Sequence, residues 1–259
     1  TNQFGNWVNG NEAMTVGRGY IVRAPGGWST TNSTFTANFV GVPNNGTITR
    51  PITRWTYTGG NTTGPTSTPV TANDDNWNLL GNPYPSAIRF TDFMAANPDL
   101  EGSIRVWTHG TLPSNANGNP FYGSFTYNYT SNDYIIHNGT GTISGPATYD
   151  GFIPAGQSFF VAMLDGAATT STVNFTNSMR VKNNNTQFYR NGNSLNEENS
   201  ASNSRIWIDL VSSTNSVISA LVGYAVGATN AKDRMFDAYT KIDNALVLYS
   251  LIDTEKACI

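Results

Sequence analysis

Charged side chains and cysteine are the residues that this sequence has least of. Lys, Arg, Asp and Glu make up 12% of the 259 residues, about half of the quarter that is usual in soluble proteins. The net charge is −3 and the 14 Lys and Arg residues are scattered, so the sequence predicts no positive face for a nucleic acid. The single cysteine, Cys258, excludes a disulfide within the chain.

Long apolar runs are missing as well. No run approaches the roughly 18–20 residues that a helix needs to cross a bilayer, so we expect no membrane span. Thr1 begins in ordinary sequence rather than in a charged-then-apolar signal, so we expect either a processed protein or an excerpt of a longer one. Asn, Thr, Ser and Gly take the place of the charges and aromatics reach 12%. This composition is typical of a secreted or surface β-protein and too rich in aromatics for disorder.

Short strand-like segments separated by turn clusters recur along the chain, roughly every 8–15 residues, which predicts an all-β fold of β-sandwich, jelly-roll-like modules. One short helix is expected near 91–97, with Thr91 as its cap and Pro98 ending it. The most distinctive stretch is Trp77–Ile88, where an apolar strand runs into Gly-Asn-Pro-Tyr-Pro-Ser. Two prolines around one tyrosine restrict the backbone there, so we predict a rigid corner.

The composition changes once along the chain. Residues 183–204 are rich in asparagine and poor in apolar side chains, which indicates a linker or a long surface loop. We therefore predict a β-sandwich domain over 1–182 and the start of a second, truncated β-sandwich over 205–259.

Several ordered phrases carry a resemblance to a known kind of module. They are WNLLGNPYPSAI at 77–88, IRVWTHG at 104–110, GFIPAGQSFFV at 151–161, FTNSMRV at 175–181, RIWIDL at 205–210 and LVGYAVGATNAKDRMFDAY at 221–239. In this order they resemble a module of large cell-surface and secreted proteins of Bacteroidota (Flavobacterium-like) that the type IX secretion system exports. The resemblance implies an extracellular β-sandwich segment of an adhesin, a gliding-associated protein or a multidomain exoenzyme, and it names no catalytic residues.

The sequence offers little support for catalysis. His109 and His137 lie on separate predicted strands without metal-ligand spacing, so we interpret both as structural or surface residues. No Gly-x-Ser-x-Gly elbow occurs, although a spatial Ser-His-Asp arrangement stays open. Asp209 is the main acid on a predicted strand, which leaves no evident carboxylate pair for glycoside hydrolysis. We therefore predict that the chain is not an enzyme.

Calcium is the metal that the sequence favours most. Asp233, Asp237 and Asp243 bracket a turn that follows an apolar strand. Hard cations take six to eight oxygen ligands, and extracellular β-modules use such loops as staples. The same acids can instead solvate or cap turns, so both interpretations stay open.

Aromatic side chains are candidates for ligand binding. Trp55, Tyr57, Trp107 and Tyr122 lie in or beside predicted strands, and flat rings beside amide hydrogen-bonding groups suit carbohydrate. Alternating aromatics also fill sandwich cores, which is the competing interpretation.

Together these patterns predict a non-enzymatic structural or adhesive module of a larger extracellular surface protein, with a filament- or matrix-forming role. Strand edges with few charges pair readily with other chains, so the expected partners are other copies or neighbouring modules. The alternative is a carbohydrate-binding module accessory to a secreted exoenzyme, with glycans as partners.

Overall fold

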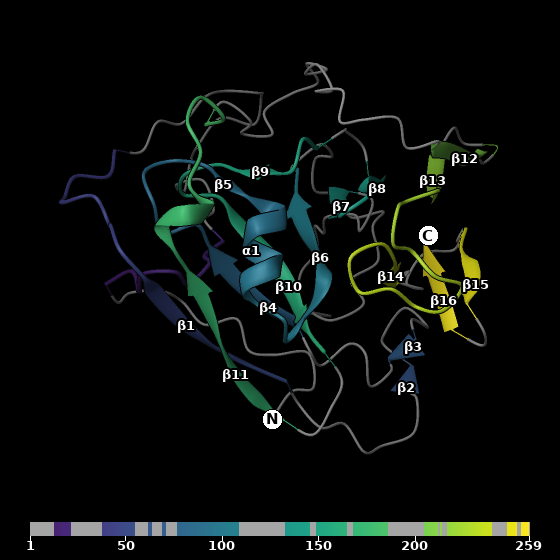
Figure 1. Ribbon diagram of the computed structural model, residues 1–259, viewed down its shortest axis with the longest axis horizontal. Helices are drawn as coiled ribbons and strands as arrows, with labels where there is room; N and C mark the ends of the chain where they lie inside the picture. Colours follow the sequence, from purple (N-terminus) through teal and green to yellow (C-terminus); the bar gives the residue numbers. More distant parts are fainter. Residues whose placement is uncertain are drawn as a thin grey trace.

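The prediction of an all-β, sandwich-like fold with one short helix is confirmed (Figure 1). The computed structural model describes residues 13–21, 38–54, 62–63, 69–70, 77–108, 133–145, 149–164, 168–185, 205–211, 213, 217–239, 248–252 and 255–258. Within these residues no helix is long and apolar enough to cross a membrane.

The strands of the described residues pair in antiparallel sheets, of which the largest has five strands. Its order is β4 (Trp77–Gly81), β10 (Ser158–Met163), β6 (Leu100–Trp107), β7 (Tyr134–Asn138) and β8 (Gly141–Ser144). Four two-stranded sheets pair β1 (Ile48–Thr53) with β11 (Thr170–Phe175), β5 (Ile88–Arg89) with β9 (Phe152–Ile153), β12 (Arg205–Val211) with β13 (Val217–Gly223), and β2 (Thr62–Thr63) with β3 (Pro69–Val70). The remaining sheet holds β14 (Ala238–Tyr239), β16 (Glu255–Cys258) and β15 (Ser250–Ile252).

The main core lies between the five-stranded sheet and the layer formed by α1 (Phe90–Ala96), β1 and β11 (Figure 1). Strand alternation points Phe159 of β10 toward this layer, where its ring centroid lies 5.4 Å from that of Phe93 on α1. Phe93 also packs at 5.3 Å from Phe175 of β11. The apolar run in β10 therefore marks an interior strand with neighbours on both sides, as its composition predicts.

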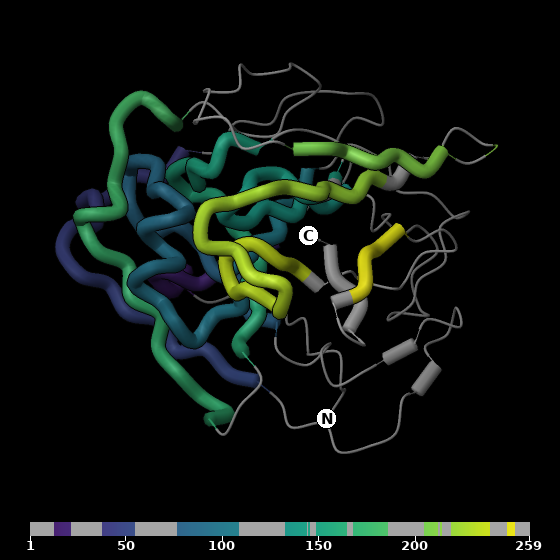
Figure 2. The backbone as a smooth tube through the Cα atoms, turned by 45° about the vertical axis from the view of Figure 1, so that its right-hand side comes forward, coloured from purple at the N-terminus to yellow at the C-terminus, as the bar shows by residue number. Residues whose placement is uncertain are grey.

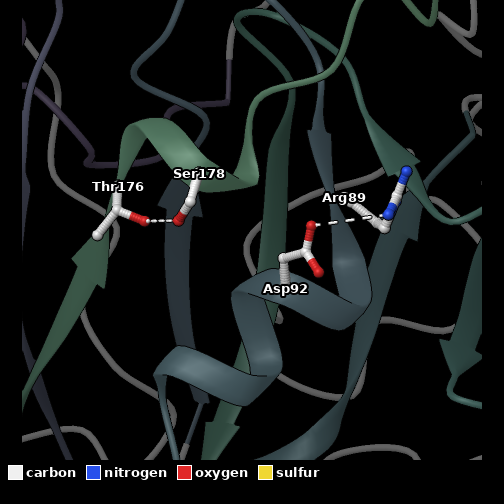
Figure 3. A network of polar contacts seen from close by, with 4 residues as sticks. All are labelled: Arg89, Asp92, Thr176 and Ser178. Carbon is white, nitrogen blue, oxygen red and sulfur yellow. Dashed lines mark hydrogen bonds and ion pairs between the residues drawn. The ribbon is translucent and has the colours of Figure 1, made fainter.

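The helix begins one residue before the expected range. Arg89, rather than Thr91, is the N-cap residue, and it makes no side-chain capping bond. Phe90, Phe93 and Met94 are all buried at helical spacing, so burial of an apolar stripe fixes the start of α1 instead of a hydroxyl cap. Arg89 lies 4.0 Å from Asp92 in the first turn (Figure 3). Thr176 and Ser178, whose hydroxyls are 2.8 Å apart, stand nearby at the 3₁₀ turn η3 (Asn177–Met179) (Figure 3).

The proline corner after β4 contains two buried side chains, Asn82 and Tyr84. The Asn82 amide donates to the carbonyl oxygens of Ser86 and Ile153, both at 2.9 Å, and its Oδ1 accepts the backbone N–H of Tyr84. Tyr84 is 2% exposed, and its hydroxyl donates to the Gly46 carbonyl at 2.6 Å. The corner thus ties β9 and the segment before β1 to the end of β4, which is a structural role.

The segment after β13 packs closely against the five-stranded sheet and α1 (Figure 2). Arg234 donates to the carbonyl oxygens of Met94, at 3.0 Å, and Asn97, at 2.6 Å, and also to that of Leu100. A Cβ on Gly102, whose φ is +87°, would lie 1.7 Å from the Arg234 carbonyl oxygen, so only glycine allows this approach.

The predicted domain boundary at residues 183–204 stays a prediction. The segment beyond it is joined to the end of β7 in the five-stranded sheet by side-chain and backbone hydrogen bonds. Gly139 N–H donates to Met235 O at 2.7 Å, and the Asn138 amide donates to Phe236 O.

Candidate interaction surface

The β12–β13 ribbon is the most exposed apolar element among the described strands. Its two strands pair without a bulge from Arg205 opposite Gly223 to Val211 opposite Val217. Among the described strands, β13 is the neighbour that β12 has in its sheet. The second edge of β12 therefore lies at the margin of this ribbon.

One face of the ribbon is anchored to β8. Leu221 is fully buried in a small cluster with Ile143 and Ala238, against which Ile136 also packs. Trp207 lies opposite Leu221 in the register, and its indole N–H donates to Thr142 O at 3.4 Å. These contacts hold the ribbon on the body of the protein by the face that carries Trp207 and Leu221.

The opposite face of β12 is apolar and open to solvent. Alternation places Ile206 and Ile208 together on it, and they are 56% and 48% exposed. On the anchored face Trp207 and Val211 are still 46% and 58% exposed. We call Ile206, Trp207, Ile208, Val211 and the edge of β12 that pairs with no described strand, its free edge, the β12 surface.

The β12 surface has few of the devices that usually blunt an edge strand. Natural edges are protected by charged side chains, above all Lys, and by Pro, bulges or short length. β12 has seven residues, RIWIDLV, in continuous register, and of these devices it carries only the charges of Arg205 and Asp209. The alternation of Ile206 and Ile208 was visible in the sequence, but their exposure was not, because the same pattern is typical of a buried sandwich face.

Trp107 lies on a second, half-buried aromatic face. Opposed residues share a face of a sheet, and the register sets Trp107 opposite Tyr134 and Arg105 opposite Phe160. The Arg105 guanidinium lies 4.2 Å from the centroid of the Trp77 ring. These side chains point away from α1, and all are partly exposed. We call Trp77, Arg105, Trp107, Tyr134 and Phe160 the aromatic face.

The other predicted ligand-binding aromatics are Trp55, Tyr57 and Tyr122. They lie outside the described residues, so their role in ligand binding stays a prediction. Trp107 stands outside the main hydrophobic core, and its role in ligand binding stays a prediction.

The acids of the predicted calcium site organise a turn. The Asp233 carboxylate accepts the backbone N–H and, at 3.0 Å, the hydroxyl of Thr229. The buried Asp237 carboxylate accepts the N–H of Asp233 at 2.5 Å, and burial raises the pKa of Asp237. Among the described residues no three His, Cys, Asp or Glu side chains gather as metal ligands. Asp243 lies outside them, so the calcium site stays a prediction.

The buried His137 side chain packs against aromatic rings. Its centroid lies 4.9 Å from that of Phe90 and 5.1 Å from that of Tyr149. Burial, together with the charge of Arg205, lowers the pKa of His137 from 6.5 to about 3, so the ring is neutral at neutral pH. Its Nδ1 meets no hydrogen-bond partner within the described residues. His109 lies outside them.

Comparison with protein families finds a family model that matches the whole sequence. The model of a family described as a domain of unknown function, DUF8693, matches residues 1–259. The chain belongs to the DUF8693 family. No curated protein and no solved structure matches it.

Proposed function

We propose that the chain is a non-enzymatic structural or adhesive module of a larger extracellular surface protein. It acts by contact between strand edges and neighbouring modules, in a filament or matrix. The observation that carries this proposal is the β12 surface, an edge strand with exposed isoleucines and no protecting lysine or proline.

The physical reason is the free energy gained when such an edge is covered. Full burial of an isoleucine side chain contributes about 1.5–3 kcal/mol. Covering the exposed halves of Ile206 and Ile208 therefore contributes about 1 kcal/mol each. Backbone groups on the free edge can add hydrogen bonds to an incoming strand. A module of this kind gains stability by joining another.

The extracellular location rests on composition and resemblance. A composition that is poor in charge and rich in Asn, Thr, Ser and Gly suits a secreted β-protein. The ordered phrases at 77–88, 104–110, 151–161, 175–181, 205–210 and 221–239 resemble modules that the type IX secretion system exports. Cleavage of the protein by a protease added to intact cells tests the location, and complete protection on intact cells would contradict it.

Cysteine accessibility tests the contact itself. Ile208→Cys and, as a control, Val40→Cys are introduced into a chain in which Cys258 is replaced by serine. Val40 is apolar and 98% exposed, and it comes before β1, a strand on the other side of the molecule from β12 (Figure 1). A maleimide should label both variants when they are isolated and diluted to monomers, but in intact surface material the variant at 208 should be protected. Equal labelling of both in that material would refute the proposal.

A second candidate function is favoured by the aromatic face. Trp107 and Tyr134 stand side by side on adjacent strands, next to Phe160, whose ring centroid is 5.9 Å from that of Tyr134. Partly exposed rings with a nearby arginine suit the stacking of a sugar. The chain would then be a carbohydrate-binding module accessory to an exoenzyme.

Affinity electrophoresis in gels containing soluble polysaccharides tests this candidate. Trp107→Ala should abolish retardation while the melting temperature stays close to that of the unsubstituted chain. Ile208→Ala, on the β12 surface, is the matched control and should retain binding. Unfolding of the Trp107→Ala variant, or no retardation of the original chain on any polysaccharide, would contradict a sugar platform.

A further inference from the structure

The pattern of charges on β12 is complementary to itself. Its two charged residues are Arg205 and Asp209, with Trp207 halfway between them. When two copies of a strand pair antiparallel about a two-fold axis, residues at equal distances from the axis lie opposite each other. An axis through Trp207 sets each Arg205 opposite the Asp209 of the other copy.

The alternation of β12 fits the same arrangement. Opposed residues in an antiparallel pair lie on the same face, so a two-fold axis must pass through a residue and not between two residues. An axis at Ile206 would set Arg205 against Trp207, and an axis at Ile208 would set it against Val211. Of these three central registers, only the one at Trp207 matches opposite charges, and it also sets Ile206 against Ile208.

The two charged side chains differ in exposure, Asp209 being exposed and Arg205 partly exposed. Asp209 is exposed and accepts one hydrogen bond, at 2.6 Å, from the Ser219 hydroxyl on β13. Arg205 is half-buried, with its guanidinium beside Gly141. Its Nε is shielded from solvent and finds no acceptor within the described residues. A carboxylate brought in by another copy would add an anion beside the partly exposed Arg205 side chain, next to which no acceptor for Nε lies among the described residues.

We propose that the partner of the β12 surface is a second copy of this chain, paired antiparallel through β12 with the two-fold axis at Trp207. This inference rests on the proposed function and names its partner. The two ribbons would join into one four-stranded sheet, with β13 of each copy at its margins. Within the proposed assembly, this contact would be the two-fold junction between like modules.

Disulfide trapping tests the register on the whole chain. Ile206→Cys and Ile208→Cys are made separately, again with Cys258 replaced by serine. A disulfide needs Cα atoms within roughly 7 Å, which the proposed register gives between position 206 of one copy and position 208 of the other. Under mild oxidation, the mixture of both variants should form about tenfold more cross-linked dimer than either variant alone, because like positions are offset along the strands.

The controls separate the possible outcomes. Val40→Cys mixed with either variant should form no dimer above background. Efficient cross-linking of either single variant with itself would indicate packing of ribbon faces and overturn the register. No dimer in the mixture would overturn the second copy as partner. The accessibility experiment on intact surface material would still show whether a different module covers β12, so the two proposals fail separately.

Charge variants provide an independent measurement by sedimentation equilibrium. Asp209→Arg sets arginine opposite arginine at both ends of the pair, so the dissociation constant should rise about tenfold. Asp209→Asn removes attraction without adding repulsion and should raise it less. An unchanged dissociation constant for Asp209→Arg would overturn the pairing.

Discussion

The contact of Arg234 with the end of α1 can be tested by replacing Arg234 with methionine. Methionine keeps an unbranched apolar chain but removes the guanidinium. The carbonyl oxygens of Met94, Asn97 and Leu100 would then lose the donors that Arg234 supplies. Two of these carbonyls lie at the carboxyl end of the helix, where a cation is favourable.

The expected loss follows from the number of donors. Two guanidinium nitrogens, Nε and Nη2, make these bonds, and a hydrogen bond to a charged group contributes about 1.5–3 kcal/mol. Burial lowers the pKa of Arg234, with the charge of Asp99 opposing the shift, so the guanidinium loses part of its hydration. We therefore take the lower value for each nitrogen, which gives about 3 kcal/mol in all.

Urea denaturation and thermal melting of Arg234→Met measure this loss. For a chain of this size, about 3 kcal/mol corresponds to a fall in melting temperature of about 6–12 °C. Arg89→Met is the matched control, because Arg89 lies at the other end of the same helix with a side chain 50% exposed. It should cost less than about 0.5 kcal/mol. If both variants lose the same small amount, the capping role of Arg234 is wrong.

Three further predictions concern the same region. Gly102→Ala should cost at least about 3 kcal/mol in urea denaturation, because strain at positive φ adds to a collision with the Arg234 carbonyl; Gly156→Ala, at φ +71° with nothing within 4 Å, should cost only about 1 kcal/mol. His137 should make the protein less stable by about 2 kcal/mol between pH 7 and pH 5, and His137→Phe should remove this part of the slope. Asp233→Ala should cost about 1 kcal/mol by loss of the turn bonds with Thr229.

The sign of the pH effect comes from the direction of the shift. Below pH 6.5 the unfolded chain binds a proton on His137, whereas the folded chain does not until about pH 3, so stability is lost as the pH is lowered through that window. An identical pH slope for His137→Phe and the original chain would contradict this. Equal losses at Gly102 and Gly156 would show that the close approach of Arg234 has no cost. A melting temperature that falls with EDTA and recovers with Ca²⁺ would establish that the protein binds calcium. The hydrogen bonds of Asp233 within the turn do not require the ion.

Local patterns predicted much of the fold. Period-2 alternation and turn clusters identified the all-β class, and the apolar run of β10 indicated its interior position. The Asn-Pro-Tyr-Pro stretch predicted a rigid corner, since proline restricts its own φ and the residue before it. The start of α1 was harder to predict, because Thr91 offers a cap whereas burial of Phe90 sets the boundary.

Contacts between distant segments had no signal in the sequence. The pairing of β1 with β11 and the insertion of Arg234 beside Gly102 join parts of the chain that no local pattern relates. An arginine in a turn-rich segment is usually solvated. The residues around Arg234 therefore do not predict that it contacts the end of α1.

The sequence by itself determined which residues alternate, where the chain turns and that charge is scarce, because these depend on neighbouring residues alone. Only the tertiary structure decided which alternating faces meet water. Phe159 and Ile208 both lie in the middle of apolar strands, yet the first is fully buried and the second is 48% exposed. The difference arises because α1 covers one face of the five-stranded sheet, whereas the ribbon is anchored to β8 by its other face. That choice of face makes the apolar side of β12 a surface for contact.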